Sequence, residues 1–180
     1  MNKVVAVVGM CGTGKSVVTE VLKKNGFSLI YFGGVVTGKV KEMGLPLTQE
    51  NERPVREALR KEYGMAAMAI VSYPQIEEDL TKGNVVIDGL YSWDEYKFLK
   101  EKLGDRLILL SVVSDQKVRY ERLKNRPIRP FTEEEAYKRD VTELETLAKG
   151  GPIAIADSFI YNNGSEEELK EKAQNFTLKL

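Results

Sequence analysis

The segment from residue 9 to residue 16 combines residue types that can bind an anion. It reads Gly-Met-Cys-Gly-Thr-Gly-Lys-Ser and fits the pattern G-x-x-x-x-G-K-S/T at every fixed position. Glycines at this spacing let successive backbone N–H groups turn toward one point and form a nest for phosphate oxygens, at the positive end of a following helix. Lys15 can then reach the terminal phosphates, and the Ser16 hydroxyl can ligate Mg²⁺. The alternative, a glycine-rich turn without a ligand, requires a chance match.

A triphosphate bound here would contact the loop and the first turn of the helix after it. The residues that we expect to contact it are Gly9, Cys11, Gly12, Thr13, Gly14, Lys15, Ser16 and Val17. Cys11 is interpreted as a small filler residue of this loop, and a redox role for its thiol is the alternative.

An acidic residue follows a second apolar run. Val85–Ile87 leads directly into Asp88 and Gly89. In a parallel sheet the carboxyl end of this strand would lie beside the phosphate loop. A carboxylate there can hold Mg²⁺ through water or act as a general base toward a hydroxyl acceptor, whereas the alternative is a turn that only ends the strand. We predict Ser16 and Asp88 as the metal-binding residues.

Arginines recur at helical spacing after Ser114. Arg119, Arg122 and Arg126 stand at i, i+3 and i+7, which places them on one face of a helix. Residues 127–131 contain two prolines and break that helix, and Arg129 lies within the break. Such arginines can close over a triphosphate and neutralise charge on a transferring group, whereas a solvated basic face is the alternative. The predicted catalytic residues are Lys15, Asp88, Arg122, Arg126 and Arg129.

The segment between residues 33 and 83 carries a second group of cations. Three of its arginines are spaced three and four apart and can line one helical face, with Pro54 at a first helical position. A phosphate acceptor mainly needs positive charge, so this face could bind one. The alternative is a solvated face paired with neighbouring glutamates. The cations are Lys39, Arg53, Arg56 and Arg60.

The elements that must position these residues alternate between strands and helices. The expected strands are Val4–Val8, Leu29–Phe32, Val85–Ile87, Leu107–Val113 and Phe159–Tyr161. The first is apolar throughout, which is typical of a strand buried on both faces of a parallel sheet. Capping boxes mark three helix starts, at Ser92 with Glu95, Thr132 with Glu135 and Ser165 with Glu168. The alternation predicts a three-layer α/β/α sandwich around a parallel sheet.

The composition limits the function classes. The 180 residues carry 27 basic and 27 acidic side chains, so no global field favours nucleic acid or an anionic membrane. One cysteine and no histidine exclude a disulfide framework and Cys/His metal clusters, which leaves acid–base chemistry to carboxylates. No apolar run approaches the roughly 20 residues of a membrane helix, and the first residues lack a signal-peptide cleavage site. We expect one cytoplasmic domain, monomeric or homodimeric.

Together these motifs resemble P-loop nucleotide and nucleoside kinases, nearest to adenylate-kinase-related and dephospho-CoA-kinase-related proteins. The similarity covers nearly the whole chain and includes GMCGTGKS, VVIDG, RLKNRPIRP and IADSFIYNNGSEEELK. It implies binding of ATP and Mg²⁺, a five-stranded parallel sheet, a helical acceptor-binding insertion over residues 33–83 and a lid over residues 126–149. The core would comprise residues 1–32, 84–125 and 150–180. The last motif implies that Asn163 and Gly164, with Arg122 nearby, border the nucleotide.

The stretches that bind the acceptor in these families are altered in this chain. Adenylate kinases carry an acid and an arginine after the second strand, where this chain has Gly-Gly-Val-Val-Thr at residues 33–37, and another arginine at residues that here read Leu-Tyr-Ser. Dephospho-CoA kinases place an aspartate base where this chain has Tyr-Phe-Gly-Gly. The matching positions leave Gly34, Thr37, Gly89 and Tyr91 as acceptor-binding residues.

These features predict transfer of the ATP γ-phosphoryl group to a nucleotide-like small molecule, either a nucleoside monophosphate or a dephospho-CoA-like compound. Two alternatives stay open. One is a regulatory ATPase that signals to a partner protein, and the other is a degenerate kinase relative that binds nucleotides without turnover.

Overall fold

A computed structural model describes residues 1–180 and shows a five-stranded parallel sheet with the strand order β2-β3-β1-β4-β5. The strands are β1 (Val4–Val8), β2 (Ser28–Tyr31), β3 (Val85–Asp88), β4 (Leu107–Val113) and β5 (Ser158–Tyr161). All four strand pairs are parallel. The five strands predicted from the sequence are therefore present, with ends displaced by at most one residue.

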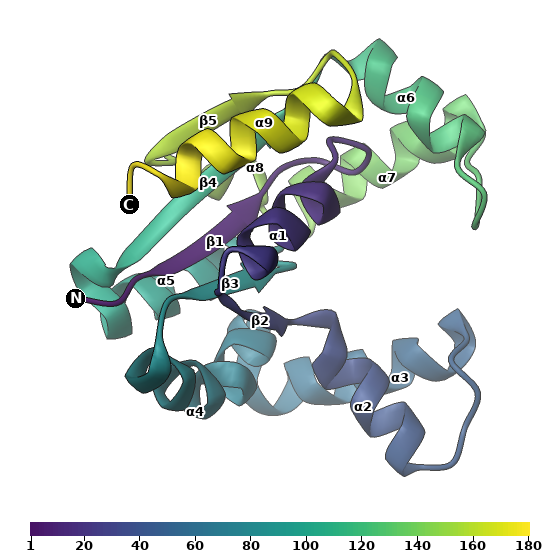
Figure 1. Cartoon of the computed structure of the whole chain (residues 1–180). Coiled ribbons are helices and arrows are strands. Elements are labelled where there is room, and N and C mark those ends of the chain that lie inside the picture. Colours follow the sequence, from purple (N-terminus) through teal and green to yellow (C-terminus); the bar gives the residue numbers. More distant parts are fainter.

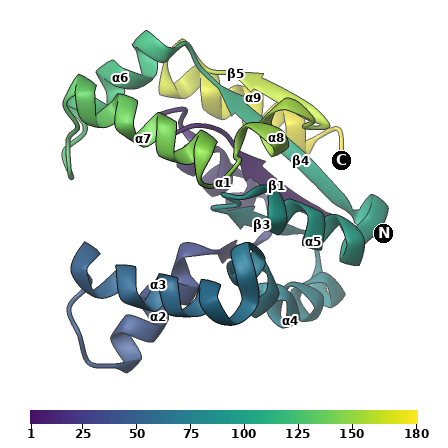
Figure 2. The same cartoon turned by 180° about the vertical axis from the view of Figure 1, so that it is seen from behind.

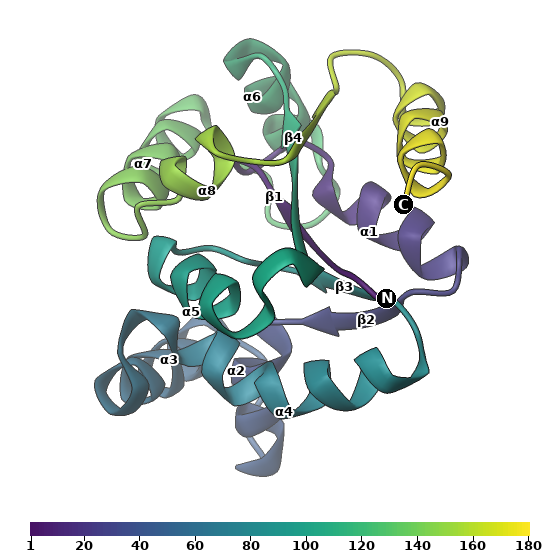
Figure 3. The same cartoon turned by 90° about the vertical axis from the view of Figure 1, so that its left-hand side faces the viewer.

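Helices cover both faces of this sheet, which confirms the three-layer architecture (Figure 3). One face packs on α1 (Lys15–Lys24) and α9 (Glu166–Thr177), and the other packs on α4 (Ala67–Lys82) and α5 (Trp93–Leu103). Strand β1 is buried on both sides because Val5 and Val7 contact the α1 core while Val4, Ala6 and Val8 contact the α5 core. Its uninterrupted apolar sequence follows from this central position.

Two helical pairs extend from the end of the sheet at which the strands terminate (Figures 1 and 2). The first is α2 (Gly33–Glu42) with α3 (Gln49–Tyr63), followed by the short 3-10 helix η1 (Gly64–Ala66). The second is α6 (Gln116–Asn125) with α7 (Glu133–Glu145), followed by α8 (Gly150–Ala154). A second 3-10 helix, η2 (Gly104–Arg106), precedes β4. None of these helices is long and apolar enough to cross a membrane.

The start of α3 differs from the sequence prediction. The helix begins at Gln49, because the Thr48 hydroxyl accepts a hydrogen bond from the Asn51 amide and caps the first turn. Pro54 therefore lies inside the helix and not at its first position. Because proline has no backbone N–H group, it removes one hydrogen bond of the helix. Pro74 likewise lies inside α4.

The predicted capping boxes are present at two of three helix starts. Both reciprocal hydrogen bonds form at Ser92 with Glu95 and at Thr132 with Glu135. At Ser165 only the serine accepts, from the Glu168 amide, and the return bond from the glutamate is not made. The side chain of Glu168 instead lies against Gly164.

Candidate phosphate-binding site

The phosphate loop runs from β1 to α1 at the carboxyl edge of the sheet, as predicted. Gly9, Gly12 and Gly14 all have positive φ, at 148°, 84° and 91°. A Cβ atom on Gly14 would lie 2.7 Å from the Asn162 amide nitrogen and 2.8 Å from a Leu169 methyl carbon. The turn therefore requires glycine for both its backbone conformation and its packing.

Four amides around the amino end of α1 have no hydrogen-bond partner in the chain. They are the N–H groups of Gly12, Gly14, Lys15 and Ser16, at the amino end of α1. The Cys11 amide, by contrast, donates to the Glu143 carboxylate at 3.2 Å. Unpartnered amides at a helix amino end form an anion site because they add to the positive end of the helix dipole.

Lys15 lies in the loop with its ammonium group donating to the Met10 carbonyl at 3.0 Å. Burial, with a further contribution from Lys149, lowers the pKa of Lys15 to about 8. Asp88 lies beside it, since β3 pairs with β1 and places Asp88 opposite Val7. Burial raises the pKa of Asp88, whereas Lys15 and Lys149 oppose that shift.

Ser16 and Asp88 offer one hydroxyl and one carboxylate to a metal ion. No group of three or more acidic, histidine or cysteine side chains is assembled in this protein. Mg²⁺ prefers oxygen ligands and usually takes only one or two from the protein, with water and substrate phosphates completing its octahedron. The donor set therefore fits Mg²⁺ bound together with a nucleotide.

Arg119 does not face a ligand site, which corrects its placement on a phosphate-facing helical face. It is buried, and its guanidinium donates to both carboxylate oxygens of Asp140 at 2.8 Å and 2.6 Å. It also donates to the Cys11 carbonyl at 3.1 Å. This pair ties α6, α7 and the phosphate loop together. Asp140 was not identified from the sequence, because no local pattern indicates its partner.

Arg122 supports the turn after β5. Its guanidinium donates to the carbonyls of Asn162 at 2.9 Å and Gly164 at 3.0 Å. Asn162, which is buried, donates from its side-chain amide to the Thr13 carbonyl at 2.8 Å. The predicted nucleotide-border residues Asn163 and Gly164 are exposed on this turn. Arg122 and Asn162 thus link the turn to the phosphate loop.

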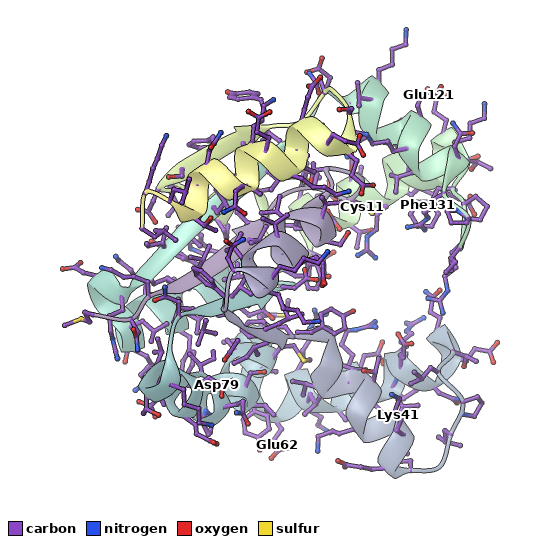
Figure 4. All side chains as sticks on the ribbon, in the orientation of Figure 1. Cys11, Lys41, Glu62, Asp79, Glu121 and Phe131 are labelled. Carbon is purple, nitrogen blue, oxygen red and sulfur yellow. The ribbon has the colours of Figure 1, made fainter.

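Arg126 and Arg129 belong to the connection between α6 and α7. Arg126 follows the last residue of α6, so it does not share the helical face predicted for it. Its guanidinium lies 4.2 Å from the ring centroid of Phe131 and donates to the Arg129 carbonyl. In Figure 4 Phe131 lies apart from Cys11 of the phosphate loop. Neither arginine forms a hydrogen bond or an ion pair with the phosphate loop.

The predicted acceptor cations divide into two groups. Arg53 is exposed and pairs with Glu57 at 2.8 Å, and Lys39 is exposed on α2, near the predicted Gly34 and Thr37. Arg56 pairs with Glu52 at 3.7 Å. Burial and the charge of Asp88 raise the pKa of Tyr31, and the charge of Arg56 opposes that rise. Arg60 is half-buried and forms no ion pair. Burial lowers the pKa of its guanidinium, and the charge of Glu95 opposes that shift.

Tyr91 packs against Gly89 after β3, and its ring contacts a lysine that sequence reasoning missed. A Cβ on Gly89 would lie 3.0 Å from the Tyr91 ring. Lys149 lies 4.8 Å from the centroid of that ring and donates to Glu143 at 2.9 Å. Lys149 and Glu143 are both fully buried, and burial lowers the pKa of Lys149. The only sequence signal was the Lys-Gly-Gly-Pro segment at residues 149–152, which begins α8.

A groove on the surface lies elsewhere. It measures about 620 Å³ and runs between α1 and α9, where eight of its ten lining residues are polar or charged. It meets the phosphate loop only at Ser16 and Val17. The candidate site is therefore assigned from the unpartnered amides and their charged neighbours and not from the size of this groove.

The fold and this loop together define a P-loop protein with a kinase fold. Shikimate kinase from Bacteroides thetaiotaomicron superposes with a TM-score of 0.59 at 15% identity and covers 99% of each chain. A gluconokinase from Sinorhizobium meliloti superposes with a TM-score of 0.58 at 18% identity, covering 98% of this chain and 97% of that chain. At such identities the likeness concerns the fold alone.

Sequence relatives give the family. An AAA domain matches residues 5–147. The UPF0200 protein of Thermococcus gammatolerans is 36% identical, covering 98% of this chain and 95% of that protein. The corresponding protein of Thermococcus kodakarensis is 36% identical, covering 95% of this chain and 94% of its own. The chain therefore belongs to the UPF0200 family and carries an AAA domain.

Proposed function

We propose that this protein is an ATP-dependent small-molecule kinase that transfers the γ-phosphoryl group to a nucleotide-like acceptor. The observation that carries the proposal is the set of four unpartnered amides beside Lys15 and Asp88 at the carboxyl edge of the sheet. These groups suit a polyanionic ligand that is anchored by its phosphates. The kinase folds of the structural neighbours support a reaction of this class.

ATP would be held by the loop residues Gly9–Val17, with Lys15 on its terminal phosphates. Asn163 and Gly164 would border the base, on the turn that Arg122 holds against the loop. Ser16 and Asp88 would hold Mg²⁺, which when bound neutralises charge on the phosphates. Catalysis in this class depends mostly on positioning and electrostatic stabilisation, so residues that fix the loop matter as much as those that touch the nucleotide.

The acceptor would bind between the strand ends and the α2–α3 pair. Arg60 is the cation best placed for an anionic acceptor, because it is half-buried without an ion pair. Arg53 pairs with Glu57 at 2.8 Å, and Arg56 pairs with Glu52 at 3.7 Å. Gly89 and Tyr91 follow β3 beside Asp88 and face the same region. A nucleoside monophosphate or a dephospho-CoA-like compound has both the negative charge and the ring system for these groups.

The test is phosphoryl transfer from radiolabelled ATP to a panel of nucleoside monophosphates, nucleosides and dephospho-CoA. Lys15→Ala should lower transfer by at least about 100-fold, because an electrostatic contact to the transferring group is lost. Lys24→Ala, at the exposed far end of the same helix, serves as the matched control and should leave transfer unchanged. Equal activity in Lys15→Ala and wild type would contradict the mechanism.

Two other outcomes would identify the alternatives. Hydrolysis of ATP at the same rate with and without every acceptor would indicate a regulatory ATPase. Tight ATP binding without hydrolysis or transfer would indicate a nucleotide-binding relative that has lost turnover.

A further inference from the structure

Lys149 is a buried cation next to the phosphate loop. It lies in the turn between α7 and α8, with none of its surface exposed. Its ammonium group donates to Glu143 at 2.9 Å and lies over the ring of Tyr91. No carboxylate other than Glu143 forms an ion pair with it.

The turn that carries Lys149 is held in one conformation. Ala148 has a positive φ of 48°, which is unfavourable for a residue with a side chain. The Trp93 amide donates to the Leu147 carbonyl at 3.1 Å, and the Trp93 ring packs on Gly151, where a Cβ would lie 2.5 Å from the ring. Local strain that the surrounding packing maintains is frequent at functional sites.

Lys149 lies between the Glu143 carboxylate, which also contacts the phosphate loop, and the ring of Tyr91. The carboxylate oxygen that accepts from Lys149 also accepts from the Cys11 amide, at 3.2 Å. Glu143 therefore joins the ammonium group of Lys149 directly to the backbone of the phosphate loop.

Stability alone does not account for this arrangement. A buried ion pair adds little to stability, because the desolvation of both charges offsets their attraction, and an apolar pair of similar size would serve as well. Two lysines near each other also repel. Arg139 adds a third cation, donating to the other oxygen of Glu143 at 3.0 Å. The three cations Lys15, Lys149 and Arg139 therefore lie near the unpartnered amides with more positive charge than Glu143 neutralises. A bound polyanion would compensate the remaining charge.

We propose that Lys149 is a catalytic residue whose ammonium group contacts the transferring γ-phosphoryl group. The proposal rests on the proposed kinase function. An acceptor phosphate oxygen forms a bond to the γ-phosphorus while the bond from that phosphorus to the bridging oxygen breaks, and ADP leaves with the electron pair. Lys149 stabilises the negative charge on the peripheral oxygens during this exchange. In the nucleotide-free protein Glu143 holds the buried ammonium group, so this contact requires the ammonium group to turn from Glu143 toward the phosphate.

The test compares the affinities for ATP and ADP by calorimetry and then measures transfer. The variant is Lys149→Met combined with Glu143→Gln, so that no uncompensated charge is buried, and Lys149→Arg tests rescue by a second cation. ATP affinity should fall at least about tenfold while ADP affinity changes less than about twofold, since only ATP carries the γ-phosphate. Lys138→Met is the matched control on α7, because Lys138 is exposed and pairs only with Glu134.

The outcomes separate this inference from the proposed function. Thermal unfolding first shows that the variant is folded. In a folded variant, an unchanged ratio of ATP affinity to ADP affinity would overturn the role of Lys149. The variant could show a lower ratio of ATP affinity to ADP affinity while the wild-type protein transfers phosphate to no acceptor. That result would support contact of Lys149 with the γ-phosphate and would overturn the kinase function. Wild-type protein that binds no nucleotide would overturn both.

Discussion

Glu95 gives a quantitative prediction about stability and pH. This residue is 2% exposed, and its carboxylate accepts hydrogen bonds from the amides of Tyr91 at 2.7 Å and Ser92 at 3.0 Å. Burial raises the pKa of Glu95 from 4.5 to about 7. The folded protein therefore binds this proton more tightly than the unfolded chain does, and unfolding releases it between these two pH values.

The sign and size of the effect follow from this difference. Stability falls with rising pH wherever the folded state binds more protons, so Glu95 should destabilise the fold progressively as the pH rises from about 4.5 to about 7. Since one pKa unit corresponds to about 1.4 kcal/mol, the total change is about 3 kcal/mol. Glu95→Gln keeps a carbonyl acceptor for the two amides but cannot ionise.

The measurement is the free energy of unfolding in urea across this pH range, for wild type and Glu95→Gln. The difference between the two should shift by about 3 kcal/mol in favour of the variant between about pH 4.5 and about pH 7. Glu135→Gln is the matched control, because Glu135 makes the same capping box on α7 while exposed, and its hydrogen bonds to Thr132 lower its pKa. That variant should lose stability relative to wild type above about pH 4.5 and approach wild type only in acid. Parallel pH profiles for wild type and Glu95→Gln would refute the role assigned to burial.

Two further changes test the scaffold of the phosphate loop. Asp140→Ala leaves Arg119 buried without a partner and should lower the free energy of unfolding by about 3–5 kcal/mol, whereas a loss below about 1 kcal/mol in urea denaturation would mean that the pair behaves as a surface ion pair. Gly14→Ala places a methyl group 2.7 Å from the Asn162 amide at φ 91° and should weaken ATP binding and cost about 1–3 kcal/mol of stability. Gly83→Ala, with extended backbone and open space around its Cβ, is the control, and equal effects of the two alanines would contradict the steric argument.

The parts of the fold that local sequence determines were predictable. The phosphate loop is specified by three glycines, a lysine and a serine within eight residues, and the burial of β1 is visible in its apolar run. The start of α3 was not predicted correctly. Thr48 is a good N-cap, and the proline six positions later removes only one hydrogen bond of the helix. Local signals competed there, and the stronger one determined the helix start.

The partners of charged residues depend on tertiary contacts. Helical spacing correctly places Arg119 and Arg122 one turn apart, but it contains no information about Asp140, which lies 21 residues away. One arginine is consequently buried in an ion pair and the other holds carbonyls of the turn after β5. Lys149 was not predicted as a site residue, because its neighbours Cys11 and Tyr91 are remote from it in the sequence.

The distribution of cations bears on the nature of the acceptor. The charges of Lys15 and Lys149 act on Asp88, and the charge of Arg56 acts on Tyr31, the residue of β2 that pairs with Asp88. Arg60, half-buried, has no carboxylate within ion-pair distance, so its desolvation is only partly offset, by the more distant charge of Glu95. A neutral hydroxyl acceptor would leave that charge uncompensated, whereas a phosphate-bearing acceptor would supply the missing anion. Because a phosphate oxygen is already a nucleophile without deprotonation, such an acceptor would also leave Asp88 free to serve the metal ion.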